Sequence, residues 1–196
     1  YHGSRWISEP FRLFDCSREN DGAGALLIVS AARARDLKRM PIHIAGVAQG
    51  AAAGWGDLLE NDDDDQYATA GFKSVARRLW EQTGLSPADI DVAQVYENFS
   101  AQGVASLIDH GFCTYESVGE FCTFENLTAP RGKLPINTSG GNLAQGFIHG
   151  IGMPIEAVRV LRGDSANPVP GAKVCLLAGG PGAPIVSSAI FSSQLV

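Results

Sequence analysis

The sequence predicts an α/β protein built on a mixed β-sheet that is covered by helices. Five apolar runs with β character recur along the chain, helical patterns lie between them, and the last two runs follow each other directly. Alternating strands and helices that end in a strand pair are typical of a mixed sheet rather than of a β-sandwich or a helical bundle. The five predicted strands are Ala25–Ser30, Ile42–Ala48, Val92–Tyr96, Val174–Ala178 and Ile185–Phe191.

The clearest predicted helix carries apolar residues at positions 72, 75, 76, 79 and 80 and ends at Gly84. This spacing places the apolar side chains on one face, which we expect to pack on the sheet. The next segment, Ser86–Asp89, has Ser as N-cap, Pro at the first position and an acid at the third, which predicts a short helical turn.

Two further helices are predicted from apolar periodicity and terminal glycines. One follows Phe99, carries Val104, Leu107 and Ile108, and ends at Gly111. The other begins at Pro154 and ends at Gly163, with apolar residues at positions 155, 158 and 161.

Composition favours a single soluble globular domain, because 45% of the 196 residues are hydrophobic and 18% are charged. A net charge of -6 argues against nucleic acid as a partner, since phosphate binding requires a concentrated basic surface. No apolar run approaches the roughly 20 residues that span a bilayer. The acidic run Asn61–Asp65 is interpreted as a solvated surface loop, with a partner-docking patch as the alternative.

The four cysteines are scattered and form no C-x-x-C pair, so neither a zinc site nor a disulfide framework is indicated and no metal is expected. A reducing cytoplasm fits this cysteine pattern. The chain begins at Tyr1 without an initiator Met or the features of a signal peptide, and we interpret it as a fragment of a longer protein.

Four sequence blocks resemble the thiolase superfamily, in particular its lipid-transfer-protein branch, which includes the thiolase-like part of the sterol carrier protein x group. The blocks are Ile7–Ser17 with Asp21–Ala25, the Val95–Ser100 run VYENFS, the glycine loop Asn137–Gly150, and the Cys175–Gly182 run CLLAGGPG. The resemblance implies one half of the thiolase fold, with a five-stranded sheet. It also implies that residues 1–20 lead in from a missing N-terminal half and that residues 21–196 form a thiolase-like C-terminal domain.

Tyr96 is the first candidate catalytic residue, because it stands at the predicted carboxyl end of a strand, where α/β proteins gather ligands. A phenol can donate a hydrogen bond to a carbonyl or, with a lowered pKa, act as a base. The resemblance implies such a role, since branch members that cleave aldol adducts of steroid side-chain thioesters use tyrosines here. The alternative is a Tyr that caps the core with its hydroxyl in solvent.

The two residues after Tyr96 have structural alternatives. Asn98 is a candidate for binding the thioester oxygen, but an Asn before Phe-Ser is also a standard helix N-cap. Glu97 matches an acidic position of the family block, where we expect a buried carboxylate to hold backbone groups rather than to titrate in catalysis.

The glycine loop allows close backbone approach, and Gly141 is a candidate for binding substrate oxygen through its amide. In thiolases a histidine in this loop activates the thiol of coenzyme A, but here that position is Phe147, which carries no titratable group. His149 is the second candidate catalytic residue. The alternative is an inward-turned histidine that packs or bonds a backbone carbonyl.

The last block lacks the second proton carrier of thiolases, because that cysteine aligns with Leu176. Neighbouring strand residues face opposite sides of a sheet, so Cys175 is not expected to replace it. The glycine turn survives, and Gly179 and Gly180 are candidates for an oxyanion hole made by backbone amides.

Three functions are consistent with these residues. The full protein is a carbon-carbon lyase or related acyltransferase acting on lipid or steroid side-chain thioesters, a non-catalytic thiolase-like subunit that binds a lipid thioester or a partner, or an authentic thiolytic acyltransferase. No tightly bound cofactor is expected, and coenzyme A is implied as part of the substrate. The implied partners are the protein's own N-terminal half, a second copy in a homodimer and an OB-fold protein.

Overall fold

The computed structural model describes residues 1–51, 69–181, 183 and 185–195. The acidic run Asn61–Asp65 lies outside the described residues. The helices are α1 (Ala31–Ala34), α2 (Lys73–Thr83), α3 (Ser100–Asp109), α4 (Val118–Phe121), α5 (Phe124–Leu127), α6 (Gly141–Ala144) and α7 (Gly152–Arg162), with short 3-10 turns η1 (Leu13–Asp15) and η3 (Pro87–Asp89). The strands are β1 (Trp6–Ser8), β2 (Phe11–Arg12), β3 (His43–Gly50), β4 (Val92–Val95), β5 (Val174–Gly179) and β6 (Val186–Ser192).

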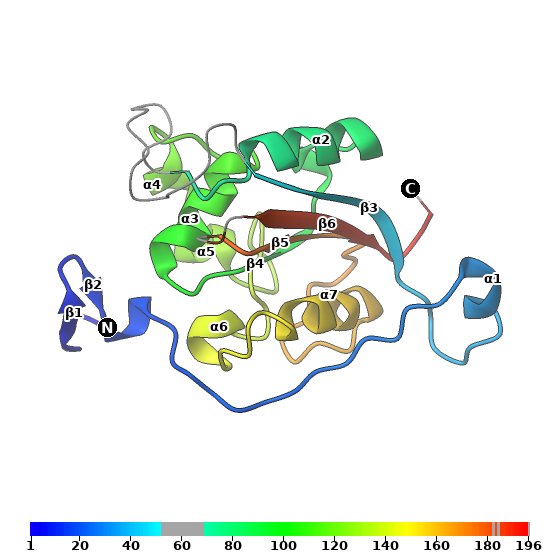
Figure 1. Cartoon of the computed structure of the whole chain (residues 1–196), viewed down its shortest axis with the longest axis horizontal. Helices are drawn as coiled ribbons and strands as arrows, with labels where there is room; N and C mark the ends of the chain where they lie inside the picture. Colours follow the sequence, from blue (N-terminus) through cyan, green and yellow to red (C-terminus); the bar gives the residue numbers. More distant parts are fainter. Residues whose placement is uncertain (52–68, 182, 184, 196) are drawn as a thin grey trace.

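A mixed four-stranded sheet with the order β3-β6-β5-β4 forms the centre of the protein. β4 and β5 run parallel, whereas β6 is antiparallel to both of its neighbours. Helices α2 and α3 lie on one side of the sheet and α6 and α7 on the other (Figure 1). The predicted α/β class with a mixed sheet covered by helices is therefore confirmed.

Each face of the sheet has its own apolar core. On the α2 side, Phe72, Val75 and Leu79 pack with Leu176 and Ile190 of the sheet. On the α7 side, Ala157, Val160 and Leu161 pack with Cys175 and Phe191. Because strand side chains alternate, the adjacent residues Cys175 and Leu176 belong to opposite cores.

The predicted helix ends are confirmed at their glycines. Gly84 caps α2 and Gly163 caps α7, with φ of 68° and 76°. Gly111 follows the C-cap of α3 with φ of 82°. These conformations are costly for residues with a Cβ, so the local sequence determines where the helices stop. The predicted capping box at Ser86 and Asp89 is also present.

The prediction of a fifth strand at Ala25–Ser30 is wrong. This segment has no strand partner in the sheet, and Leu27 and Ile28 are 80% and 75% exposed. The blue segment in Figure 1 runs past α6 and α7 on the side away from the sheet, so the α7 layer separates it from β4 and β5. A short apolar run resembles a strand in sequence, and periodicity cannot show which layer it joins.

The predicted apolar stripe of α7 is confirmed in part. Leu161 is buried and Val158 packs against the α7-side core, together with Ala157 and Val160, whereas Ile155 is half-buried. Ile155 lies instead against Gly24 of the extended segment before α1, where a Cβ would be 2.5 Å from its Cδ1 atom.

Candidate functional site

The candidate site lies at the carboxyl ends of the parallel strands β4 and β5. Val95 is paired with Ala178, and the Tyr96 amide donates a hydrogen bond of 2.8 Å to the Ala178 carbonyl. Tyr96 and the turn at Gly179 and Gly180 therefore leave the sheet side by side. This placement agrees with the sequence-based expectation for Tyr96, because the carboxyl edge of parallel strands is where ligands bind in α/β sheets.

Three rings form a continuous row at this edge. The ring centroids of Tyr96 and Phe147 are 6.0 Å apart, with an interplanar angle of 75°. Those of Phe147 and His149 are 4.8 Å apart, at 40°. The structure thus brings the two candidate catalytic residues to one place, with Phe147 in contact with both.

Gly150 completes the row because it lies against the face of Tyr96. A Cβ at this position would lie 2.7 Å from Tyr96 Cδ2 and 2.8 Å from Cε2, well inside normal van der Waals contact. Gly150 also has φ of 79°, a conformation that favours glycine. The loop therefore needs glycine here for two reasons, backbone conformation and the space that the Tyr96 ring occupies.

His149 is exposed at the surface and is not turned into the core. Its φ of 52° is unusual for a residue with a Cβ. Its ring contact is with Phe147. The inward-packed histidine considered from the sequence is therefore not what the structure shows.

The lead-in segment holds the loop through Asn20, a residue that the sequence analysis did not single out. The Phe147 amide donates a hydrogen bond of 3.1 Å to Asn20 Oδ1, and Glu19 forms a β-bridge with Phe147. Asn20 also lies against Gly146, where a Cβ would be 3.7 Å from its Cγ atom. Asn20 and Phe147 are more than 120 residues apart in the sequence. No local sequence pattern predicts a contact at this separation, so only the tertiary structure reveals it.

Glu97, the residue after Tyr96, is buried and only 7% exposed. Its Oε1 atom accepts hydrogen bonds from the amides of Asn142 (2.8 Å) and Leu143 (3.4 Å), at the start of α6. The expectation that this carboxylate holds backbone groups is confirmed. Burial raises its pKa to about 7, however, so Glu97 exchanges its proton near neutral pH.

Gly141 has a packing role beneath Glu97. A Cβ on Gly141 would lie 1.8 Å from Glu97 Oε1, which no side chain could occupy without displacing the carboxylate. Gly141 is buried, and its amide donates to Ser139 Oγ at 3.4 Å. Its contacts are therefore with Glu97 and Ser139 rather than with the row of rings.

The interpretation of Asn98 as the N-cap of the following helix is wrong. The N-cap of α3 is Phe99, and no side chain caps it. The Asn98 carbonyl accepts a hydrogen bond from the Ser17 amide, and this contact keeps the chain extended through Phe99. The Asn98 side chain accepts a hydrogen bond of 3.2 Å from the Phe99 amide, and the helix begins one residue later than an Asn98 cap requires.

Strand β5 ends at Gly179, and a turn follows at Gly180. Gly180 has φ of 87°, and its carbonyl accepts a hydrogen bond of 3.0 Å from the Ala183 amide. Leu176 and Cys175 precede the turn and are fully buried in opposite cores. Burial raises the pKa of the Cys175 thiol, so it behaves as a small apolar group, as predicted.

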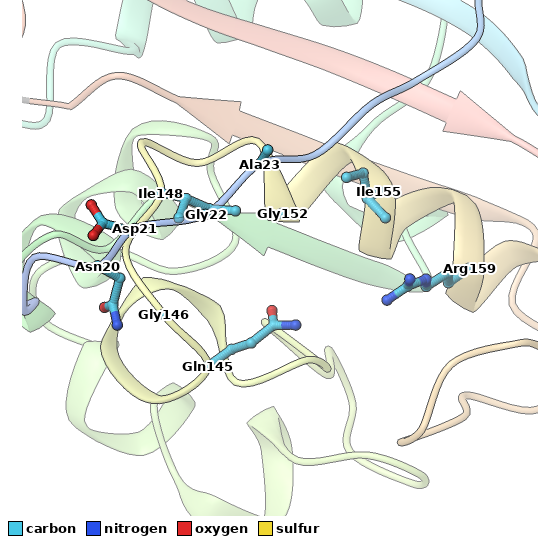
Figure 2. A pocket seen from close by; sticks show the side chains of 10 residues that line it. All are labelled: Asn20, Asp21, Gly22, Ala23, Gln145, Gly146, Ile148, Gly152, Ile155 and Arg159. Carbon is cyan, nitrogen blue, oxygen red and sulfur yellow. The ribbon is translucent and has the colours of Figure 1, made fainter.

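A pocket of about 310 Å³ lies beside the glycine loop (Figure 2). Its walls come from residues 20–23, the α6–α7 loop and α7. Figure 2 shows Ile148 and Ile155 beside Gly22 and Ala23, with Asn20, Asp21 and Gln145 at one end and Arg159 at the other. Ile148 lines this pocket beside the polar side chains, whereas its neighbours Phe147 and His149 belong to the row of rings.

Residues 38–192 match the family described as "Thiolase C-terminal domain-like". The chain is 40% identical, over 94% of its length, to the 17-hydroxy-3-oxo-4-pregnene-20-carboxyl-CoA lyase of Mycobacterium tuberculosis. It is 37% identical, over the same share, to the steroid side-chain-cleaving aldolase of Thermomonospora curvata. In each case it covers 47% of the relative, so the chain spans about half the length of these proteins.

A solved structure, that of an Ltp2-ChsH2(DUF35) aldolase, matches with a TM-score of 0.91 and 37% identity. The match covers 97% of this chain and 50% of that one. Sterol carrier protein 2 of Bos taurus is 31% identical over 88% of this chain and 33% of its own length. None of the helices within the described ranges, 1–51 and 69–195 with two single gaps, has the length and apolar character of a membrane span.

Proposed function

The chain belongs to the family of thiolase C-terminal domain-like proteins, and from this we propose that it is the C-terminal part of an acyl-coenzyme-A lyase. The proposed enzyme breaks a carbon-carbon bond in a lipid or steroid side-chain thioester by a retro-aldol reaction. Relatives named as a lyase and an aldolase support the reaction type. A steroid or similarly bulky acyl group is the substrate class that we propose.

The observation that carries the proposal is the position of Tyr96. Its ring lies at the carboxyl edge of the sheet, in a row with Phe147 and His149. Burial raises the pKa of its phenol, and the nearby charge of Glu97 raises it further. A phenol with a raised pKa keeps its proton near neutral pH, so Tyr96 acts as a hydrogen-bond donor or acid rather than as a base.

A retro-aldol step needs one group that takes a proton and one that gives a proton. The β-hydroxyl of the substrate loses its proton to a base as its carbon-oxygen bond becomes a carbonyl. The bond between the α and β carbons breaks, and its electron pair forms the enolate of the shortened thioester. A proton on the α carbon completes the reaction.

Two residues of this chain have the chemistry for these roles. We assign proton donation to Tyr96, and we assign His149, whose imidazole is exposed in the same row, to proton removal. Backbone amides at the Gly179 and Gly180 turn, beside Tyr96, would stabilise negative charge on the thioester oxygen. Coenzyme A enters only as part of the substrate, and we propose no tightly bound cofactor.

Thiolytic acyl transfer is the weaker candidate because two proton carriers are missing from this half. Phe147 has no titratable group, and Leu176 is fully buried in the α2-side core. A non-catalytic subunit that binds a lipid thioester remains the alternative function, since the same two positions also remove ordinary thiolase chemistry. The pocket beside Ile148 and Ile155 offers apolar surface for either function.

The missing parts of the active enzyme are also proposals. The chain spans about half of its relatives, and we propose that an N-terminal half of the same protein completes the site. A second copy in a homodimer and an OB-fold partner protein are the further partners that we propose, in the cytoplasm.

The test uses the full-length protein, with and without an OB-fold partner, and a β-hydroxyacyl-coenzyme A with a steroid side chain. We expect release of a ketone or aldehyde together with the shortened thioester. Tyr96→Phe should lower kcat by about 10² to 10⁴, the usual contribution of a general acid. Tyr115→Phe is the matched control, because Tyr115 is 43% exposed and lies outside the row of rings.

Three outcomes separate the candidates. Carbonyl release that depends on Tyr96 and not on Tyr115 supports the lyase. Tight thioester binding without any product identifies the binding subunit, and the lyase is then refuted. Equal rates in the wild type and Tyr96→Phe refute the role of Tyr96.

A further inference from the structure

The outer edge of β4 is paired with a segment that is not one of the strands of the sheet. β4 is the last strand in the order β3-β6-β5-β4. On its outer side, the Ala93 amide donates a hydrogen bond of 3.0 Å to the Pro135 carbonyl, and the Asn137 amide donates one of 3.0 Å to the Ala93 carbonyl. Ala93 and Ile136 thereby form a parallel β-bridge. Residues 135–137 therefore act as a short additional strand beside β4.

The Asn137 side chain continues this ladder by one step. In a regular parallel pair, the next two bonds would join the Val95 amide to the Asn137 carbonyl and the Ser139 amide to the Val95 carbonyl. Here the Val95 amide donates instead to Asn137 Oδ1 at 2.8 Å, and Asn137 Nδ2 donates to the Val95 carbonyl at 2.9 Å. A side-chain amide thus takes the place of the backbone groups that the ladder requires.

The backbone does not make these bonds because it turns away at Asn137. Asn137 has φ of 46°, and its carbonyl accepts a hydrogen bond of 2.7 Å from the Gly140 amide, at the start of the glycine loop. Asn is one of the few residue types with a Cβ that adopt this left-handed conformation readily. Its amide also combines an acceptor oxygen with a donor nitrogen, whereas an aspartate has no donor. Asparagine therefore suits both the turn and the strand end.

Two parts of the candidate site begin at this point. Val95 is the last residue of β4, and Tyr96 follows it, with its amide bonded to β5 on the other side. The glycine loop that starts at Asn137 carries Phe147 and His149, the other two rings of the row. The Asn137 amide therefore joins the base of the phenol to the start of the loop.

The residue after Asn137 attaches the loop independently to the other elements. Thr138 is buried, and its hydroxyl donates a hydrogen bond of 2.6 Å to Glu156 Oε1 of α7. The same hydroxyl accepts a bond of 3.1 Å from the Gln94 side chain, and the Thr138 carbonyl accepts one of 2.6 Å from Asn167 Nδ2. Loss of the Asn137 amide should therefore shift the end of β4 relative to the loop without detaching the loop from α7.

We propose that Asn137 is a positioning residue for Tyr96, because its side-chain amide fixes the strand end from which Tyr96 leaves the sheet. This inference rests on the proposed function, since Tyr96 is the group through which Asn137 acts. The oxygen and the nitrogen of the Asn137 side chain are both bonded to the Val95 backbone, so Asn137 is not assigned a contact with the substrate.

Asn137→Gly in the full-length protein tests this role, because glycine adopts the left-handed backbone readily and lacks the amide. Asn126→Ala is the matched control. Asn126 is half-buried like Asn137, and its side chain also makes two hydrogen bonds, to the carbonyls of Glu120 (3.2 Å) and Phe121 (3.1 Å). Both variants lose two bonds, but only Asn137→Gly loses them beside Tyr96.

Two measurements separate positioning from stability. With the β-hydroxyacyl thioester, kcat should fall by roughly 10² in Asn137→Gly with little change in KM, the effect of a displacement of about 1 Å at a catalytic group. Asn126→Ala should turn over like the wild type. In protein labelled with fluorotyrosine, the fluorine resonance of Tyr96 is identified by its loss in Tyr96→Phe. This resonance should shift in Asn137→Gly and stay in place in Asn126→Ala.

An unshifted Tyr96 resonance in Asn137→Gly overturns the proposal, and so does an equal loss of kcat in Asn126→Ala. If Asn137→Gly does not fold, Asn137→Asp decides, because it keeps the acceptor for the Val95 amide and loses only the donor. A shifted resonance in Asn137→Asp then supports the role, and a resonance at the wild-type position refutes it. Absence of turnover in the wild type would refute the lyase alone, since the fluorine resonance reports the surroundings of the ring without any reaction.

Discussion

Gly150 offers the sharpest test of the site geometry, because replacing it with alanine acts on Tyr96 through a single methyl group. The new Cβ would lie 2.7 Å from Tyr96 Cδ2, whereas carbon atoms in contact prefer about 3.5–4.0 Å. The ring must therefore move by about 1 Å. Forcing a methyl group into a packed site costs about 1–3 kcal/mol. The φ of 79° adds about 1–2 kcal/mol for a residue with a Cβ.

Gly171→Ala is the matched control for the backbone cost alone. Gly171 has φ of 82° in the turn before β5, and a Cβ there would meet nothing within 4 Å. We expect Gly171→Ala to lower the free energy of unfolding by about 1–2 kcal/mol and Gly150→Ala to lower it by about 2–5 kcal/mol. The difference between the two variants measures the contact between Gly150 and Tyr96.

The assay is denaturant unfolding of the full-length protein, followed by kinetics on the β-hydroxyacyl thioester. A displacement of about 1 Å at a proton donor lowers kcat by roughly 10², so Gly150→Ala should be slow and Gly171→Ala should turn over like the wild type. Equal stability losses and equal rates in the two variants would show that Tyr96 does not rest on Gly150, and the arrangement of the site would be wrong.

Two further predictions concern Phe147 and His110. Phe147→Tyr adds a phenol hydroxyl to the ring that contacts Tyr96 and His149, and should raise kcat of the proposed lyase by roughly tenfold or more, whereas Phe147→Leu should not. Burial lowers the pKa of His110 to about 4, so the unfolded chain takes up this proton first as the pH falls. The free energy of unfolding should therefore fall by about 3 kcal/mol between pH 6.5 and 4 because of His110. His110→Leu should lack this part of the pH dependence in denaturant titrations, and an identical slope in both proteins would contradict the assignment.

Much of the fold could be predicted because its signals are local. The apolar stripe of α2, the capping box at Ser86 and the terminal glycines Gly84 and Gly163 each act within a few residues. Alternation along β5 likewise separates Cys175 from Leu176 without reference to any other part of the chain. Such features depend on backbone conformation and on side-chain direction, which neighbouring residues determine.

The two wrong predictions concern segments whose conformation depends on contacts with parts of the chain that are distant in sequence. Ala25–Ser30 has the composition of a strand, but it lies on the far side of α7, where Leu27 and Ile28 remain exposed. The sequence around Asn98 is typical of an N-cap. The Asn98 carbonyl, however, accepts a hydrogen bond from the Ser17 amide, and α3 begins one residue later, with Phe99 as its N-cap.

The sequence by itself determined the order and type of the main elements, the placement of Tyr96 at a strand end, and the loss of titratable groups at Phe147 and Leu176. Only the tertiary structure decided that Tyr96, Phe147 and His149 form one row and that burial raises the pKa of Glu97 to about 7. The physical reason is that burial and electrostatic environment sum over segments far apart in the chain. The type of a residue limits the chemistry that it can perform. The residues around it in the folded protein determine its pKa and its hydrogen-bond partners, and therefore whether it performs that chemistry.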